Sequence, residues 1–428
     1  MMIYYSEDKF NIKTEIIIMA QFLAFHGLLP EPEKAALVSA VPYDVVNTEE
    51  AAALAEGNPL SFLHVARPEI DMAPGIDLHD DSVYAQAKAA FDKLCETAPL
   101  KTDAGKHLYI YQLEMNGRVQ TGVIGAASAA EYQAGIIKKH EKTRADKEDD
   151  RTRHVMTLRS HTGPAFFTYR DSEKIDALVA AETAREPLFN FVSCDGIRHT
   201  LWRVDEAASC TLSGLFESEV PVFYIADGHH RSAAAARTAK ECAPNNPAHD
   251  GTEDYNFFLA VAFPANQLAI MPYNRVVKSL NGMSEDEFIA KLNDKFEISN
   301  TDDACVCAPG QFKFYLSGVW RKAVPKFDIA SLGVIGSLDV SYLQEFVLAP
   351  MLNIDDPRTS KDIDFIGGIR GTAELEKLVN SGKYAVAFSM PAVTVEQLMA
   401  IADAGEIMPP KSTWFEPKLR DGLVSHNF

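Results

Sequence analysis

The chain reads Val222-Phe-Tyr-Ile-Ala-Asp-Gly-His-His-Arg231 near its middle and continues as Ser232-Ala-Ala-Ala-Ala-Arg-Thr-Ala239. An apolar run of strand-forming residues meets an Asp-Gly break, and an alanine-rich helix follows. Free backbone N–H groups and the positive end of the dipole attract anions to the start of a helix. This order predicts a strand over 221–226, an anion-binding turn and a helix over 232–242, as in a mixed α/β domain.

The turn itself gathers an acid, two imidazoles and a guanidinium. Gly228 lets the backbone approach a ligand closely. Arg231, which we expect at the surface, can form bidentate hydrogen bonds to phosphate or carboxylate oxygens. An ordinary helix-capping turn is the alternative, but the concentration of reactive side chains favours a functional site.

The composition describes a globular protein with more than one core, since the chain has 428 residues and 47% of them are hydrophobic. Its net charge of −19 argues against general binding to nucleic acid or to an anionic membrane, which depends on Lys and Arg. A local basic pocket for a small phosphorylated ligand remains compatible with that charge. No apolar run reaches the ~20 residues that span a bilayer, and the six scattered cysteines suit reduced thiols in a cytoplasmic protein.

Turn and periodicity signals divide the chain into four segments. These are an N-terminal extension over 1–18, an N-terminal region over 19–104, a central domain over 105–280 and a C-terminal α/β region over 281–428. The central domain has a hairpin signal, two apolar runs joined by Asn116-Gly117. Further strands are expected at 61–66, 165–169, 257–263, 312–316 and 384–389, and helices at 49–56, 82–96, 205–217 and 339–349.

A second concentration of charge lies at Lys138-Lys-His-Glu-Lys-Thr-Arg-Ala-Asp-Lys-Glu-Asp-Asp-Arg-Thr-Arg-His154. Its favourable and like-charged i,i+4 pairs nearly balance, so it is not tuned for a free surface helix. A solvated helix face and a polyanion site with its metal both stay open. Phosphoryl transfer needs cations and N–H groups around phosphates, carboxylates for Mg²⁺ and a carboxylate that accepts a proton, and the two clusters supply all three. Zinc is disfavoured, because no His-Glu-x-x-His or Cys/His ligand spacing is present.

Two motifs, His140-Glu141-x-x-Arg144 and Asp227-Gly-His-His-Arg231, resemble those of the free serine kinases of the ParB/sulfiredoxin-like fold. Those enzymes phosphorylate the hydroxyl of free L-serine with ADP or ATP. The resemblance covers the central domain, and the motifs lie further apart here. From about Met19 onward, the chain also resembles a large prokaryotic family of unknown function, often labelled ParB-like, in Pro42-Tyr-Asp-Val, Lys139-His-Glu-Lys-Thr-Arg, Asp146-Lys-Glu-Asp-Asp-Arg, Ala226-Asp-Gly-His-His-Arg and Met408-Pro-Pro-Lys-Ser-Thr.

The resemblance implies a mixed α+β chain whose central ParB/sulfiredoxin-like domain carries α/β regions packed on it. It implies a phosphotransferase that uses ATP or ADP with Mg²⁺ on a small free amino acid, L-serine above others. The base would be Glu141, with Asp227 and His140 beside it. Nucleotide or phosphate contacts are expected at Gly228, His229, His230, Arg231, Ser232 and Arg144. Mg²⁺ ligands are expected at Asp227, Asp149 and Asp150. Further substrate or anion contacts are expected at Arg151, Arg153, His154, Lys411, Ser412 and Thr413.

Two other functions stay open. A regulatory protein that senses a nucleotide or an amino acid would bind without turnover, and the intact Glu141 favours the enzyme over it. A ParB-like nucleotide-binding protein is a further alternative. A ParB-type DNA-partition protein is opposed by the negative charge and by the lack of a recognisable helix-turn-helix. The segment Met408–Lys418 is too rich in proline for regular structure, and we expect it to reach the site. The sequence leaves open the nucleotide, the exact acceptor and the oligomeric state, including a homodimer.

Overall fold

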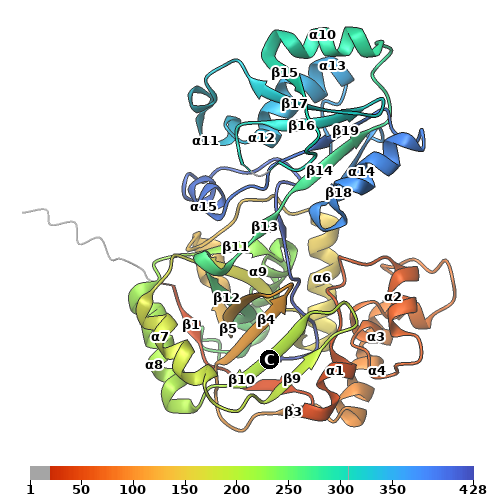
Figure 1. The fold of residues 1–428 in the computed structure, drawn as a ribbon. Helices are drawn as coiled ribbons and strands as arrows, with labels where there is room; N and C mark the ends of the chain where they lie inside the picture. The colour runs from red at the N-terminus through yellow and green to blue at the C-terminus, as the bar shows by residue number, and fades with distance from the viewer. Residues whose placement is uncertain (1–19, 307) are drawn as a thin grey trace, which may run out of the picture.

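The computed structural model describes residues 20–306 and 308–428. The expected extension over 1–18, together with Met19 and Cys307, lies outside the described residues. Two large β-sheets organise the described part of the chain, and Figure 1 shows one above the other. The mixed α/β class expected from the sequence is confirmed, while the ParB/sulfiredoxin-like fold stays a prediction.

The larger sheet has nine strands in the order β6-β11-β8-β12-β5-β4-β10-β9, with β1 paired to β5. The Asn116-Gly117 turn joins β4 to β5 with both residues at positive φ, 52° and 77°, so the predicted hairpin is confirmed. Two pairs, β6 with β11 and β8 with β12, are parallel. The strands are β1 Phe22–Leu23, β4 Tyr109–Met115, β5 Arg118–Ser128, β6 Ile137–Lys138, β8 Ala165–Tyr169, β9 Phe189–Val192, β10 Arg198–Arg203, β11 Phe223–Asp227 and β12 Phe257–Pro264.

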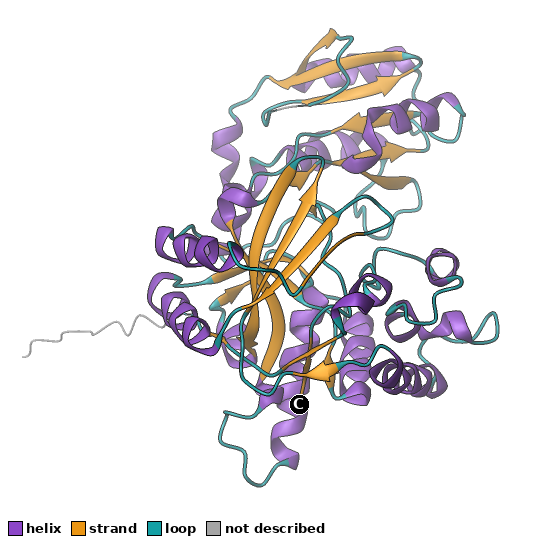
Figure 2. Cartoon of the chain, turned by 60° about the horizontal axis from the view of Figure 1, so that its bottom comes forward, coloured by secondary structure: helices purple, strands orange, loops and turns teal. Residues whose placement is uncertain are grey.

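Helices surround this sheet, as Figure 2 shows, and the N-terminal ones form a separate cluster beside it. The strand predicted over 61–66 is wrong, because these residues form a turn and the short helix α3. All of Leu63, Val65 and Ala66 are buried, so alternation along the sequence gives no information about the secondary structure. The helices are α1 Ala35–Val38, α2 Thr48–Ala55, α3 Leu63–Ala66, α4 Asp81–Thr97, α5 Ala129–Ala134, α6 Ala145–Leu158, α7 Glu173–Thr183, α8 Glu206–Glu219 and α9 His229–Cys242.

The second sheet has six antiparallel strands in the order β15-β17-β16-β19-β14-β18. The helix predicted over 339–349 is present, interrupted by the π-helical turn η7 Gln344–Leu348. The strands are β14 Tyr273–Val277, β15 Phe296–Asn300, β16 Phe312–Leu316, β17 Val319–Pro325, β18 Ile363–Gly367 and β19 Val386–Ser389. The helices are α10 Glu285–Lys295, α11 Gly333–Gly336, α12 Asp339–Leu343, α13 Ala349–Leu352, α14 Gly371–Asn380 and α15 Val395–Asp403.

Within the described residues, no single helix has the length and apolar character needed to cross a membrane. One bent pair, Ile329–Gly336 with Asp339–Leu352, passes by length and composition alone, and its two parts meet at 100°. Its second part packs into the hydrophobic core through Val340, Leu343 and Val347.

The two sheets are joined by a side-chain cluster around Asp403, the last residue of α15. Its carboxylate accepts hydrogen bonds from Lys138 (2.6 Å), from Arg170 (2.8 Å) and from the hydroxyl of Tyr224 (2.9 Å). All three partners belong to β6, to β11 or to the residue after β8 in the nine-stranded sheet. The contact therefore holds the C-terminal body against the nine-stranded sheet where β6 and β8 end and β11 begins.

The C-terminal segment then returns to the nine-stranded body. Its short strand β20 Trp414–Phe415 pairs with β13 Ile270–Met271, and the rest of Met408–Lys418 is irregular, as the prolines predict. Its last strand, β21 Ser425–Asn427, lies between β2 Gly27–Leu29 and β7 Ser160–His161, with β3 Lys101–Thr102 beyond β2. Residues 408–428 thus contact both bodies and the N-terminal helical cluster.

Gly422 offers a test of how tightly this segment docks. Its φ is +83°, and a Cβ there would lie 2.6 Å from the ring of Phe62. Gly422→Ala should lower the thermal midpoint clearly, since backbone strain costs about 1 kcal/mol or more and overpacking about 1–3 kcal/mol. Gly405→Ala is the control, because Gly405 has a φ of +70° with no atom within 4 Å of the added Cβ. Equal calorimetric shifts for the two variants would contradict the tight docking.

Candidate functional site

The pairing of β6 with β11 brings the two charged motifs together. Ile137 lies beside Phe223 and Lys138 beside Tyr224 in a parallel register, so both strands end at the same edge of the sheet. The chain after β6 continues into Glu141, and the chain after β11 continues into α9. As a result, Oε2 of Glu141 lies 3.9 Å from Nδ1 of His229.

Helix α9 begins at His229, earlier than the predicted start at Ser232. Gly228 is its N-cap with a φ of 85°, a left-handed conformation that glycine adopts without strain. No side chain caps the helix, and Ala233, Ala234, Ala235 and Ala236 are buried, so the backbone lies close to the sheet. The first turn therefore carries His229, His230 and Arg231, with its N–H groups free of side-chain caps.

Asp227 is the last residue of β11 and directly precedes the N-cap Gly228 of α9. Its Oδ1 accepts a hydrogen bond from the N–H of Gly228 at 2.8 Å. Its Oδ2 accepts a hydrogen bond from Nζ of Lys418 at 3.1 Å and lies 3.9 Å from the guanidinium of Arg231. Burial alone would raise the pKa of Asp227, but the cations of Lys418 and Arg231 hold it well below its ordinary value. Asp227 is therefore a permanent anion paired with a lysine from the C-terminal segment.

Two buried histidines lie between the motifs. The rings of His140 and His229 are 4.6 Å apart at 89°, edge to face. Burial lowers the pKa of His140 to about 4 and that of His229 well below its usual range, so both are neutral at pH 7. Within the described residues, Nδ1 of His140 and Nε2 of His229 have no hydrogen-bond partner. Nε2 of the third histidine, His230, accepts the N–H of Arg144 at 3.1 Å.

Glu141 is half exposed, with 48% of its side chain accessible. Partial burial raises the pKa of the Glu141 carboxyl. The positive charge of Lys411 lowers this pKa, and the negative charge of Asp227 raises it further. A carboxylate with a raised pKa and an accessible oxygen can accept a proton from a nearby hydroxyl.

Met408–Lys418 reaches the same place, as the sequence analysis expected. The N–H of Met408 donates to the carbonyl of His140 at 2.8 Å, and the hydroxyl of Thr413 lies 3.4 Å from Nε2 of the same histidine. Lys418 pairs with Asp227 and lies 5.0 Å above the Trp414 ring. The Ser412 hydroxyl, in contrast, is buried and donates to the carbonyl of Pro409 at 2.6 Å. Sequence reasoning missed Lys418, although it stands in the segment singled out for its prolines.

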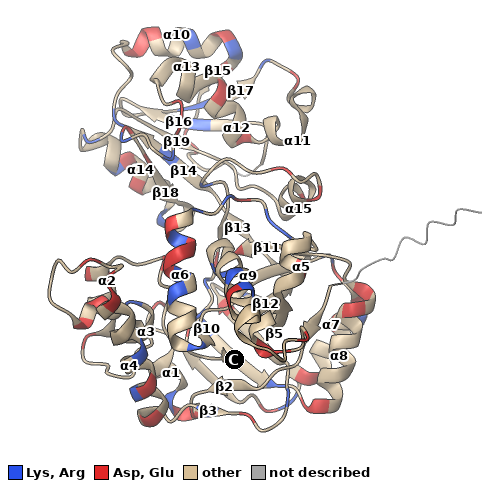
Figure 3. Ribbon diagram, turned by 180° about the vertical axis from the view of Figure 1, so that it is seen from behind, with Lys and Arg blue, Asp and Glu red and all other residues tan. Residues whose placement is uncertain are grey.

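Helix α6 is neither a solvated helix nor wholly part of the site. Its alternating charges are visible in Figure 3, but Asp150, Thr152 and His154 are buried against neighbouring helices. Asp150 accepts the Tyr84 hydroxyl at 2.8 Å and pairs with Arg151 at 2.8 Å. Three other predicted residues form ion pairs: Arg144 with Asp146, Asp149 with Arg237, and Arg153 with Asp81. Two more donate hydrogen bonds to backbone carbonyls, His154 to Val65 and Ser232 to Gly228.

The three predicted Mg²⁺ ligands do not form a centre. Asp149, Asp150 and Asp227 are each bound to a cation, and the described ranges hold no group of three or more His, Cys, Asp or Glu side chains placed for a metal ion. The residues present do not fit a resident metal.

Arg231 is not at the surface as expected. Only 11% of its side chain is exposed, and it donates to the carbonyl of Pro164. The small Gly228 explains this position, because a Cβ there would lie 3.1 Å from Nε of Arg231.

The fold and the site thus define a mixed α/β protein with a buried polar site between two sheets. The chain belongs to the family described as "Protein of unknown function (DUF1015)", whose profile matches residues 22–341. No curated protein matches it in sequence.

Several solved structures are similar over most of the chain. A mutant free serine kinase in complex with AMP is 14% identical at a TM-score of 0.35, covering 70% of this chain and 88% of its own. A conserved hypothetical protein from Pyrococcus furiosus is 14% identical at 0.32, covering 71% and 94%. SbnI with a C-terminal truncation, from Staphylococcus aureus, is 11% identical at 0.37, covering 70% and 85%.

Buried neutral histidines make stability depend on pH. Burial lowers the pKa of His154 to about 4 from an ordinary 6.5. Its contribution to stability is therefore complete above pH 6.5 and is lost as the pH falls towards 4, about 3 kcal/mol in all. His154→Gln keeps a donor for the Val65 carbonyl without a titrating group, so chemical denaturation should show a smaller loss between pH 7.5 and pH 4.5. His79→Gln, at a side chain 51% exposed, is the control and should lose as much as the parent.

Proposed function

We propose that the chain is a nucleotide-dependent phosphotransferase that moves the terminal phosphoryl group of ATP or ADP to the hydroxyl of a small free amino acid, L-serine above others. One observation carries the proposal: Glu141 lies 3.9 Å from a side chain in the uncapped first turn of α9. A proton acceptor and an anion-binding helix start therefore adjoin. The motif resemblance to free serine kinases supports the same chemistry.

The phosphates would bind at the first turn of α9. Its N–H groups are uncapped and carry the positive end of the helix dipole. Lys418 and Arg231 supply positive charge on either side of Asp227. The neutral His140 and His229 add hydrogen-bonding nitrogens without adding charge.

Glu141 would act as the base. In the transfer, the acceptor oxygen forms a bond to the terminal phosphorus while the bond from that phosphorus to its bridging oxygen breaks. The leaving ADP or AMP keeps the electron pair, and the hydroxyl proton moves to the Glu141 carboxylate. The raised pKa of Glu141 strengthens it as a proton acceptor, and Lys411 opposes part of that rise. No step is assigned to Mg²⁺, since the described residues do not fit a resident metal.

Glu141→Gln tests this role directly. The amide keeps the shape of the side chain but cannot accept the proton, so single-turnover transfer to L-serine should fall by about 10²–10⁴. Nucleotide affinity by calorimetry should stay equal or rise slightly, because one negative charge near the phosphates is lost. The assay contains Mg²⁺ with ATP or ADP and a panel of free hydroxyl amino acids, followed by mass spectrometry.

Glu173→Gln, at an exposed position on α7, is the matched control and should retain full activity. Equal turnover by Glu141→Gln and the parent would exclude Glu141 as the base. Nucleotide or amino acid binding by the parent without turnover would favour a sensing protein instead.

A further inference from the structure

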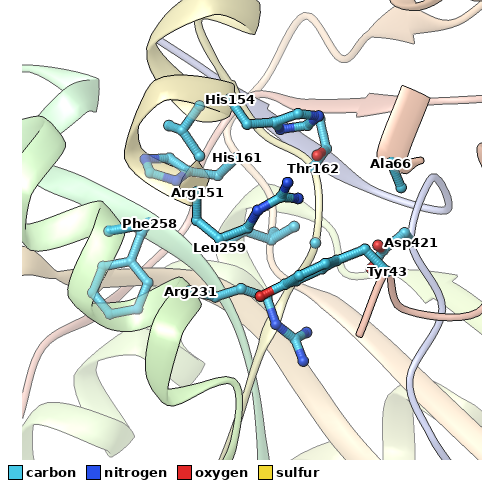
Figure 4. Close-up of a pocket in the computed structure, with 13 residues that line it drawn as sticks. Tyr43, Ala66, Arg151, His154, His161, Thr162, Arg231, Phe258, Leu259 and Asp421 are labelled. Atoms are coloured by element: carbon cyan, nitrogen blue, oxygen red, sulfur yellow. The ribbon is translucent and has the colours of Figure 1, made fainter. Parts of the chain in front are cut away.

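A small cavity is lined in part by Arg231. It has a volume of about 40 Å³ and lies between α6, α9, β12 and the C-terminal segment. Figure 4 shows its polar wall, with the Tyr43 ring between the guanidinium groups of Arg151 and Arg231 and with Asp421 beside that ring. Arg151 lies 4.1 Å above the Tyr43 ring. The wall thus combines two cations with one carboxylate.

Three residues that line the cavity each carry one buried polar atom without a hydrogen-bond partner within the described residues. These atoms are Nε of Arg231, Oδ1 of Asp421 and Nε2 of His161. Asp421 is only 4% exposed, and no described cation lies within ion-pair distance of it. Leaving a buried polar atom unpaired costs about 1–3 kcal/mol each. Three such atoms on residues that line one cavity indicate a polar occupant.

Gly163, which also lines the cavity, lies directly beside Asp421 and supports the same conclusion. Its Cα packs directly against the carboxylate, because a Cβ there would lie 2.9 Å from Oδ1 of Asp421. The missing side chain leaves room for Asp421 to point into the cavity. Position 163 therefore accommodates the Asp421 carboxylate, whose Oδ1 accepts no hydrogen bond from the described residues.

Size and charge define the ligand class. A cavity of this volume holds about three water-sized groups, too few for a nucleobase or a sugar. An acceptor at Asp421 beside donors at Arg231 suits a ligand that carries a cation and an anion on neighbouring atoms. The ammonium and carboxylate of an α-amino acid have this arrangement.

We propose that the cavity binds the ammonium and carboxylate groups of the amino acid acceptor, with Asp421 facing the ammonium and Arg231 facing the carboxylate. The inference rests on the proposed function and adds the groups that select its acceptor. Arg231 joins the two parts of the site, since its NH2 lies 3.9 Å from Oδ2 of Asp227 and the residue also lines the cavity. The exposed Asp44 raises the pKa of both Asp421 and Glu141, so the cavity and the base lie within electrostatic reach of one carboxylate.

Calorimetric titration of the full chain with three small ligands tests the proposal. L-serine carries both charges, 3-hydroxypropionate lacks the ammonium, and ethanolamine lacks the carboxylate. The parent should bind L-serine about tenfold or more tightly than either analogue. Asp421→Asn should weaken L-serine binding about tenfold or more while leaving the affinity for 3-hydroxypropionate unchanged.

Two further variants guard against misfolding and non-specific effects. Gly163→Ala should weaken L-serine binding through displacement of the Asp421 carboxylate, although it leaves that residue in place. Asp176→Asn on α7 changes an aspartate outside the cavity and should bind like the parent. Thermal melts establish that each variant is folded.

The outcomes separate this inference from the proposed function. Unchanged L-serine affinity in folded Asp421→Asn, or equal parent affinities for L-serine and 3-hydroxypropionate, would overturn the cavity assignment. Transfer to L-serine with an unchanged KM in that variant would do the same while leaving the phosphotransferase intact. L-serine binding that depends on Asp421, without transfer by the parent to any hydroxyl, would support the cavity and overturn the phosphotransferase.

Discussion

The parallel pairing of β6 with β11 is the constraint on which the site depends. Only two register pairs define it, Ile137 with Phe223 and Tyr224 with Lys138. Parallel strands end at the same edge, so this short pairing places the loop that bears Glu141 against the start of α9. An antiparallel pairing would send the two loops to opposite ends of the sheet. The cluster around Asp403 fixes the second body beside this same pair of strands through Lys138 and Tyr224.

Asp227 and Glu141 each have a cation nearby, while the imidazoles of His140 and His229 stay neutral. Asp227 is held by Lys418 and Arg231, and Glu141 is opposed by Lys411. Burial raises the pKa of Asp421 to about 7, although nearby arginines pull it down. The least compensated group is therefore the one that faces the cavity, as expected where a ligand supplies the missing charge.

Short sequence motifs made several parts of the fold and of the site predictable. The Asp-Gly break fixed the end of β11, and Asn116-Gly117 fixed the β4–β5 hairpin. The motif resemblance brought Glu141 and α9 into one hypothesis. The strand prediction over 61–66 was wrong because Leu63, Val65 and Ala66 are all buried and give no alternation to read. Arg231 lies inward because Gly228 has no side chain to displace it. Lys418 and Asp421 could not be placed, since their partners are set by the path of the C-terminal segment and not by neighbouring residues.

The span between Asp227 and Lys418, 191 residues along the chain, also sets the order in which the protein assembles. Contacts this distant are entropically costly to close, and they form late. Before the C-terminal segment docks, the Asp227 carboxylate lacks its lysine, and burying it then would be unfavourable. Until this segment docks, the junction lacks one of the two cations that hold down the pKa of Asp227. Completion of folding and completion of the site are one cooperative event, and partly folded chains hold no finished site.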